Sequence, residues 1–237
     1  MEQYRSLARF YDLTYEERGK DYKREVAYLQ DVIRRFKKSG GKKLLDVACG
    51  TGEHLKHFKA FDRTGLDLNG GVLVEARKKL PKTTFLQADM TSFSLDQEFD
   101  VITCLFSSIG YVHTKTNLQK TCRNFARHLK PGGVALIEPW FSPGEFKDRH
   151  VSFTPVEKPG LSIARMGETR KRKRDCTVTF HWLIGEHGEG VRYVKDEQVL
   201  GLFTEEETVA ALERAGFRVK HYKKGPAGRG LYVAVKE

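Results

Sequence analysis

The stretch from Leu44 to Leu55 constrains the fold of this chain more than any other part of its sequence. Leu44 to Val47 is a short apolar run, which is typical of a buried parallel strand. Gly50 and Gly52 follow, and because neither carries a Cβ the backbone can turn tightly there and approach a ligand. Glu53 to Lys59 is rich in helix formers. The stretch therefore predicts a strand, a glycine loop and a helix, the order that opens a nucleotide-type site in a doubly wound α/β sheet.

The residues around this loop indicate which kind of nucleotide it binds. The Gly-Lys-Ser/Thr ending of a phosphate-binding loop is absent, and Leu55 occupies the place of the third glycine of a dinucleotide fingerprint. Glu53 would also repel a pyrophosphate at a helix N-terminus. A cationic ligand meets no such objection, and Asp46 and Asp67 add negative charge on either side of the loop. The site therefore suits S-adenosylmethionine, whose sulfonium is positive.

The second strand of the predicted sheet ends in a carboxylate. Arg63 to Leu68 is expected to be this strand, and Asp67 lies roughly where a ribose-binding carboxylate is expected. The alternative role for Asp67 is a helix N-cap, which Asn69 can supply instead. We therefore expect Asp67 to bind the two ribose hydroxyls, in charge-assisted bonds worth about 1.5–3 kcal/mol each.

The form Asp-x-x-x-Gly-x-Gly at Asp46 to Gly52 resembles the first motif of the class I methyltransferases. In that pattern an acidic residue after the third strand, here Asp89, accepts a hydrogen bond from the adenine amino group. Met90 then supplies its backbone and an apolar wall. The resemblance implies a seven-stranded, doubly wound, Rossmann-like sheet with S-adenosylmethionine as cofactor and no metal.

Composition limits the class of protein further. The 237 residues suffice for one domain, or for one domain with a sizeable insertion, and 39% hydrophobic residues without a long apolar run argue against a membrane span. No apolar signal segment begins the chain, so we expect a cytoplasmic protein. The four cysteines show no paired spacing. The net charge of +11 is compatible with an anionic substrate, a nucleic acid or a charged surface, and we interpret the dense run from Arg170 to Arg174 as a solvated face or hairpin tip.

The sequence pattern changes over residues 142–201. Alternating segments such as Cys176 to Trp182 predict antiparallel strands, and hence a small inserted β-sheet. Residues 1–141 and 202–237 would then form the methyltransferase core, with residues 1–40 as an N-terminal lid and helix. Thr204 and Glu207 form a capping box that begins the first helix after the insertion.

Taken together, several short pieces spread over nearly the whole chain resemble the N,N-dimethyltransferases that act on TDP-linked amino sugars in desosamine and mycaminose biosynthesis. The pieces are Gly19 to Tyr22, Leu44 to Gly52, Cys104 to Gly110, Glu138 to Trp140, Leu202 to Thr204 and Gly225 to Leu231. The glycine loop and the acidic residues identify only the superfamily, whereas Ser-Ser-Ile-Gly, Glu-Pro-Trp and Gly-Arg-Gly-Leu are more specific. This resemblance implies an antiparallel insertion and commonly a homodimer.

The resemblance also implies roles for individual residues. Tyr4 and Arg229 are expected to hold the nucleotide diphosphate. The role of Arg229 also has a physical reason, because a guanidinium binds phosphate in a bidentate manner and the glycines on both sides permit close approach. Ser108 and Trp140 complete the expected acceptor site, with Ser107 positioning the reacting groups. The expected cofactor-binding residues are Tyr11, Tyr22, Ala48, Gly50, Gly52, Asp67, Leu68, Asp89, Met90 and Leu105.

One residue departs from the family pattern. Several sugar dimethyltransferases carry His after Ser-Ser-Ile-Gly, whereas this chain carries Tyr111. A tyrosine can orient an amine by hydrogen bonding but is a poor general base at neutral pH, because its pKa is about 10. An amine that arrives neutral needs no base, since proximity and orientation supply about 7–11 kcal/mol in principle.

The leading hypothesis is therefore an N-methyltransferase that moves a methyl group from S-adenosylmethionine to the amine of a TDP-linked amino sugar or a similar small molecule, releasing S-adenosylhomocysteine. An N- or O-methyltransferase of a free small metabolite is the alternative. An RNA methyltransferase is a third reading, motivated only by the charge and the Arg170 to Arg174 run.

Overall fold

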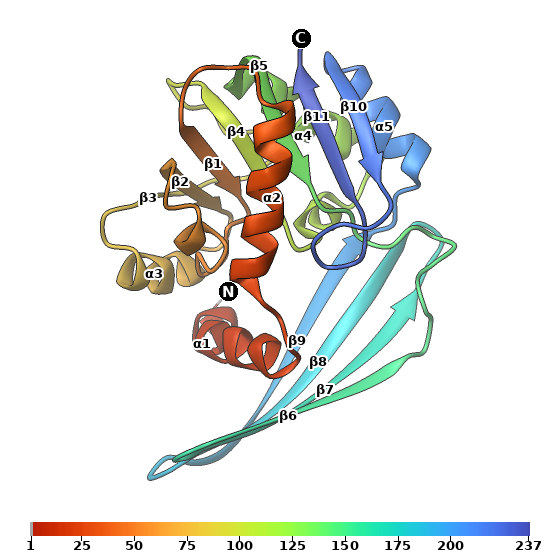
Figure 1. Ribbon diagram of the computed structural model, residues 1–237. Coiled ribbons are helices and arrows are strands. Elements are labelled where there is room, and N and C mark those ends of the chain that lie inside the picture. The colour runs from red at the N-terminus through yellow and green to blue at the C-terminus, as the bar shows by residue number, and fades with distance from the viewer. Residues whose placement is uncertain (1) are drawn as a thin grey trace.

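The computed structural model describes the backbone of residues 2–237 and the side chains from Leu7 onward. A seven-stranded sheet, sheet A, forms its centre in the order β10-β11-β5-β4-β1-β2-β3 (Figure 1). β1 pairs in parallel with both β2 and β4, so the strand order reverses beside it, at the point where such sheets bind ligands. The strands are β1 (Lys43–Val47), β2 (Asp62–Asp67), β3 (Thr84–Gln87), β4 (Phe99–Cys104), β5 (Leu129–Ile137), β10 (Phe217–Tyr222) and β11 (Leu231–Lys236).

Helices cover both faces of sheet A, as the doubly wound prediction requires. Neighbouring strand residues point to opposite faces: Leu44 packs in the core under α2 and α3, whereas Leu45 packs in the core under α4 and α5. The helices are α2 (Tyr22–Phe36), α3 (Gly70–Lys79), α4 (Lys115–His128) and α5 (Glu205–Glu213), with 3-10 turns η1 (Leu55–His57) and η2 (Ser108–Val112). The predicted capping box of α5 is confirmed: Thr204 and Glu207 exchange their hydrogen bonds.

A second, antiparallel sheet, sheet B, lies below sheet A in Figure 1 and packs against the N-terminal helix α1 (Glu2–Glu17). Leu7 and Phe10 of α1 are buried with Ile163 and Trp182 of sheet B in a third core cluster. The N-terminal segment, which the sequence predicts to be a lid, forms a helix that contacts α3 of the core and strands β6 and β9 of sheet B. The strands of sheet B are β6 (Val151–Lys158), β7 (Leu161–Lys171), β8 (Asp175–Glu186) and β9 (Gly190–Gly201).

The two faces of sheet B differ in what covers them. The inner face, which carries Arg165 and Trp182, is buried against α1. The outer face exposes a contiguous set of large apolar side chains, because the strand register places them beside one another across the sheet. Among them are Phe153, Met166, Leu183 and Tyr193, which are 61%, 49%, 51% and 56% exposed.

One predicted element is wrong. The segment from Glu53 to Lys59 does not continue as an α-helix but makes only the 3-10 turn η1. The Arg63 guanidinium binds the carbonyl oxygens of Leu55 and Lys56, at 3.1 and 3.5 Å, which an α-helix would use for its own next turn. Leu55 and Phe58 are fully buried, so hydrophobic packing also fixes this short connection.

Candidate active site

The glycine loop after β1 turns through three residues with positive φ: Ala48 at 57°, Gly50 at 54° and Gly52 at 83°. This left-handed backbone favours glycine, and at Gly52 a Cβ would also lie 3.3 Å from Leu80. The loop is covered by α1, because the Thr51 hydroxyl donates to the Asp12 carboxylate at 2.9 Å. Lys79 of α3 joins the same cluster by pairing with Asp12 at 2.6 Å.

Asp67 stands at the end of β2 with each carboxylate oxygen bound to the backbone. Its Oδ2 accepts from the Gly50 N–H and its Oδ1 from the Asn69 N–H, both at 2.8 Å. A carboxylate has about four lone-pair sites, so each oxygen keeps one acceptor position. Two adjacent acceptor positions match the two hydroxyls of a ribose. Asn69 caps α3 by accepting from the Gly71 N–H at 2.8 Å, so that helix does not need Asp67 as its cap.

An apolar surface flanks Asp67 on the side expected for adenine. Leu68 is 65% exposed, and Met90 is half-buried beyond β3. Asp89 is exposed, and its Oδ1 accepts from the Thr91 N–H at 2.7 Å. The residues present therefore fit S-adenosylmethionine: paired acceptors for the ribose, an apolar wall for the base, and a loop that admits close approach.

Beyond β4 the chain turns sharply at the crevice. Phe106 and Ser107 both have positive φ, at 51° and 65°, which is strained for residues that carry a Cβ. The Ser107 hydroxyl donates to the Pro139 carbonyl at 2.6 Å and accepts from Arg229 Nη1 at 2.7 Å. The Arg229 guanidinium also lies 5.3 Å from the Trp140 ring. The structure thus brings together Ser107, Trp140 and Arg229, which are far apart in the sequence, and Leu105 is buried beside them.

Glu138 is a residue of this crevice to which the sequence analysis assigned no role. It directly follows β5 and is completely buried, and its Oε2 accepts from the Phe106 N–H at 2.6 Å, which holds the strained turn. Its Oε1 has no hydrogen-bond partner among the described residues. Burial raises the pKa of this carboxyl, although the nearby Arg229 and Lys20 charges oppose the shift. A carboxylate directly after a buried strand was the available signal, but a sequence does not show that its second oxygen is free.

A buried chain of polar groups lies behind the glycine loop. His54 Nε2 contacts Glu25 at 2.8 Å, and the Lys20 ammonium pairs with the same carboxylate at 2.7 Å. Asp46 accepts from the Thr103 hydroxyl at 2.7 Å, and burial raises the pKa of Asp46 to about 6. Lys20, Glu25 and His54 come from separate segments, so no local sequence pattern indicates that they form this cluster.

The tyrosines predicted around the site take different positions. The Tyr11 hydroxyl donates to Asp196 of β9, so this side chain joins α1 to sheet B. Tyr22 packs its ring edge-on against His54, with centroids 4.9 Å apart, and burial raises its pKa. The Tyr111 hydroxyl donates to Gln198 of β9 at 2.8 Å. Tyr4 lies outside the described side chains, and Ser108 is half-buried at the start of η2.

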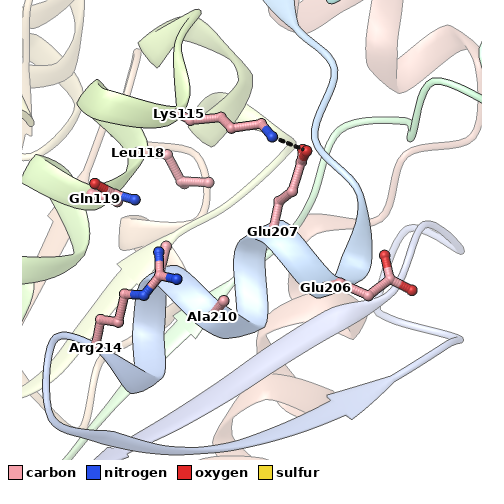
Figure 2. Close-up of a pocket in the computed structure, with 8 residues that line it drawn as sticks. Lys115, Leu118, Gln119, Glu206, Glu207, Ala210 and Arg214 are labelled. Carbon is pink, nitrogen blue, oxygen red and sulfur yellow. Dashed lines mark ion pairs between the residues drawn. The ribbon is translucent and has the colours of Figure 1, made fainter.

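Other surface features lie away from this crevice. Figure 2 shows a pocket between α4 and α5, which the Lys115–Glu207 ion pair spans at 2.5 Å. Its lining residues belong to these two helices or, for Arg214, directly follow α5, and do not belong to the loops that follow the strands of sheet A. The run from Arg170 to Arg174 lies at the β7–β8 hairpin, as the hairpin-tip interpretation predicted. No described helix is long and apolar enough to cross a membrane. No group of three metal-ligating side chains occurs in the part of the chain that the structure describes.

Comparison with known proteins supports the same chemistry. Residues 44–133 match the family model described as a methyltransferase domain. The chain is 41% identical over 227 residues to dTDP-3-amino-3,4,6-trideoxy-alpha-D-glucopyranose N,N-dimethyltransferase of Streptomyces venezuelae, covering 95% of each chain. It is 35% identical over 231 residues to dTDP-3-amino-3,6-dideoxy-alpha-D-glucopyranose N,N-dimethyltransferase of Streptomyces fradiae, covering 97% of this chain and 90% of the relative.

Two solved structures extend this likeness to three dimensions. DesVI of Streptomyces venezuelae superposes with a TM-score of 0.91 at 41% identity, covering 96% of this chain and 97% of that chain. CalS10, an amino pentose methyltransferase of Micromonospora echinaspora bound to S-adenosylmethionine, superposes with a TM-score of 0.87 at 34% identity, covering the same shares of the two chains.

Proposed function

The chain belongs to the family of S-adenosylmethionine-dependent sugar N,N-dimethyltransferases, and on that premise we propose that it methylates the amine of a TDP-linked amino sugar. The observation that carries the acceptor class is the Arg229 guanidinium beside Ser107 at the crevice. Arg229 binds no acidic side chain within the described residues. A guanidinium is suited to binding phosphate in a bidentate manner.

We propose that the cofactor is held by the glycine loop and by the carboxylates beyond it. Ala48, Gly50 and Gly52 allow the cofactor to approach the backbone closely. Asp67 accepts hydrogen bonds from the two ribose hydroxyls, and Leu105 closes the crevice. The remaining contacts are assigned to Tyr11, Tyr22, Leu68, Asp89 and Met90. When bound, S-adenosylmethionine supplies an electrophilic methyl group whose C–S bond electrons leave with the sulfur as the amine nitrogen attacks.

We propose that Glu138 prepares the amine. An alkylammonium has no lone pair for attack, so one proton must leave before transfer. The unpartnered Oε1 of Glu138 can accept this proton, which converts the ammonium to a neutral amine and the carboxylate to a carboxylic acid. Tyr111, Ser107 and Ser108 then position the acceptor, and Trp140 forms the apolar side of its site. Tyr111 is not required as a base in this scheme.

The likeness to the DesVI and CalS10 structures favours a small acceptor over RNA. A free metabolite remains the competing acceptor class, and Arg229 distinguishes the two. Arg229→Ala should lower kcat/KM for a TDP-amino sugar by about 10- to 150-fold, because a charge-assisted hydrogen bond contributes about 1.5–3 kcal/mol. The affinity for S-adenosylhomocysteine should not change. Turnover of TDP-amino sugars at the wild-type rate by the variant would remove the support for a diphosphate-bearing acceptor.

We further propose a cytoplasmic homodimer that pairs through the outer face of sheet B. Exposed Phe153, Met166, Leu183 and Tyr193 form an apolar patch there, and such patches mark protein interfaces. We also propose that residues 142–201 constitute an inserted unit distinct from the core formed by residues 1–141 and 202–237.

A further inference from the structure

Arg165 is a charged residue buried on the inner face of sheet B. It lies on β7 with only 1% of its surface exposed, and its Nη1 and Nη2 have no hydrogen-bond partner among the described residues. By contrast, Arg174 and Arg192 each pair with a glutamate, at 2.6 and 2.7 Å. A buried charge without a partner is costly, so such a residue needs a ligand or a special environment.

The environment of Arg165 is aromatic. Its guanidinium carbon lies 4.9 Å from the Tyr15 ring, 4.8 Å from the Phe180 ring and 5.2 Å from the Trp182 ring. Rings at these distances attract a cation through their faces. They hold the guanidinium in place, but they do not replace the acceptors that its N–H groups bind in water, so Nη1 and Nη2 keep donors without a described acceptor.

Trp182 adds a third donor of the same kind. It pairs directly with Arg165 across the β7–β8 ladder, is completely buried, and its Nε1 also lacks a partner in the described chain. Two neighbouring strands therefore present three donor nitrogens, Nη1 and Nη2 of Arg165 and Nε1 of Trp182, that lack a described acceptor. Donors of this kind, one of them charged, suit an anion with several oxygen atoms.

A chain of ring contacts connects this cluster to the crevice. The Tyr15 ring meets the Phe106 ring edge-on, with centroids 4.7 Å apart, and the Arg229 guanidinium carbon lies 5.5 Å from the centroid of the Phe106 ring. Arg165 from the insertion and Arg229 from the core thus flank the Tyr15–Phe106 pair. Tyr15 belongs to α1, which covers the glycine loop.

We infer that Arg165 and Trp182 form a second anion-binding subsite, which binds the diphosphate of the acceptor from the side opposite Arg229. This inference rests on the proposed function, because that function supplies the diphosphate. The phosphate oxygens accept hydrogen bonds from the Nη1 and Nη2 groups of Arg165 and from the Nε1–H of Trp182. Since Arg165 is sealed by α1, the Tyr15 ring turns aside when the diphosphate binds, and the aromatic cage opens on one side only.

The experiment measures the binding of thymidine 5′-diphosphate by calorimetric titration of the full chain, with S-adenosylhomocysteine as the second ligand. Arg165→Met should weaken diphosphate binding at least 10-fold and leave S-adenosylhomocysteine affinity within about 3-fold of wild type. Arg165→Lys, which keeps the charge but loses the planar fork, should be intermediate. Lys195→Met is the matched control: it removes one positive charge from the opposite face of the same sheet, and it should bind thymidine 5′-diphosphate as the wild type does.

Thermal unfolding without ligand separates this role from a purely structural one. If Arg165 waits for a ligand, replacing a buried unpaired charge by methionine leaves the melting temperature equal or raises it. If the aromatic cage alone explains Arg165, the variant melts several degrees lower and binds the diphosphate normally, which overturns the inference. Equal diphosphate binding by wild type and by folded Arg165→Met or Arg165→Lys also overturns it while the proposed function stands. A wild-type protein that binds no thymidine 5′-diphosphate refutes the proposed acceptor class, and this inference with it.

Discussion

Replacement of Asp67 by alanine tests the cofactor site most directly. Each oxygen of Asp67 holds one backbone N–H, of Gly50 or Asn69, at 2.8 Å and keeps one position for a ribose hydroxyl. Two charge-assisted bonds at about 1.5–3 kcal/mol each give about 3–6 kcal/mol. We therefore expect the dissociation constant for S-adenosylhomocysteine to rise by about 10²–10⁴-fold, as measured by calorimetric titration.

The same substitution also releases the Gly50 and Asn69 amides, so the loop itself needs a control. Asn69→Ala removes the α3 cap on the same loop, at a cost of about 0.5–2 kcal/mol of stability, but keeps the Asp67 carboxylate. We expect this control to melt at a lower temperature and to bind S-adenosylhomocysteine within a few-fold of wild type. If Asp67→Ala is folded and its affinity falls less than 10-fold, Asp67 does not hold the ribose and the assignment is refuted.

Three further predictions concern pH, catalysis and assembly. Burial raises the pKa of Asp46 from 3.8 to about 6, so the free energy of unfolding should fall by about 3 kcal/mol in total as pH rises through that interval. In denaturant unfolding, Asp46→Asn should be as stable as the wild type near pH 4 and more stable than the wild type above pH 6. Glu138→Gln keeps an acceptor for the Phe106 N–H but no base, so kcat should fall about 100-fold near neutral pH and recover at high pH; an unchanged pH profile would contradict the base role. Leu183→Lys together with Met166→Lys should convert a dimer to a folded monomer in light scattering, whereas an unaltered mass would place the interface elsewhere.

The sequence predicted the parts of the fold that depend on local patterns. The runs Leu44 to Val47 and Arg63 to Leu68 predicted parallel strands, and the glycines predicted the turn, because these signals lie within a few residues of each other. The helix after the glycine loop was predicted wrongly because its competitor is not local. The Arg63 side chain, several residues downstream, takes the carbonyl groups that would have continued that helix.

The site was less predictable than the fold for the same reason. Asp67 and the glycine loop could be found, since both stand at strand ends in a regular order. The free oxygen of Glu138 could not, because its being unpartnered depends on packing by segments far away in the chain. The buried charge of Arg165 was invisible for a related reason: an arginine on an alternating strand normally indicates a solvent-facing position.

Both faces of sheet B carry apolar residues. An antiparallel sheet with one solvent face alternates polar and apolar side chains, yet here Trp182 and Ile163 are buried on the inner face while Leu183 and Met166 are exposed on the outer face. The helix α1 covers only the inner face. A sheet that is apolar on both faces needs a second cover, and in the proposed homodimer a second copy of the chain would supply it. The insertion would then serve two purposes: its inner face, with Arg165, completes the acceptor site, and its outer face joins two such sites in one assembly.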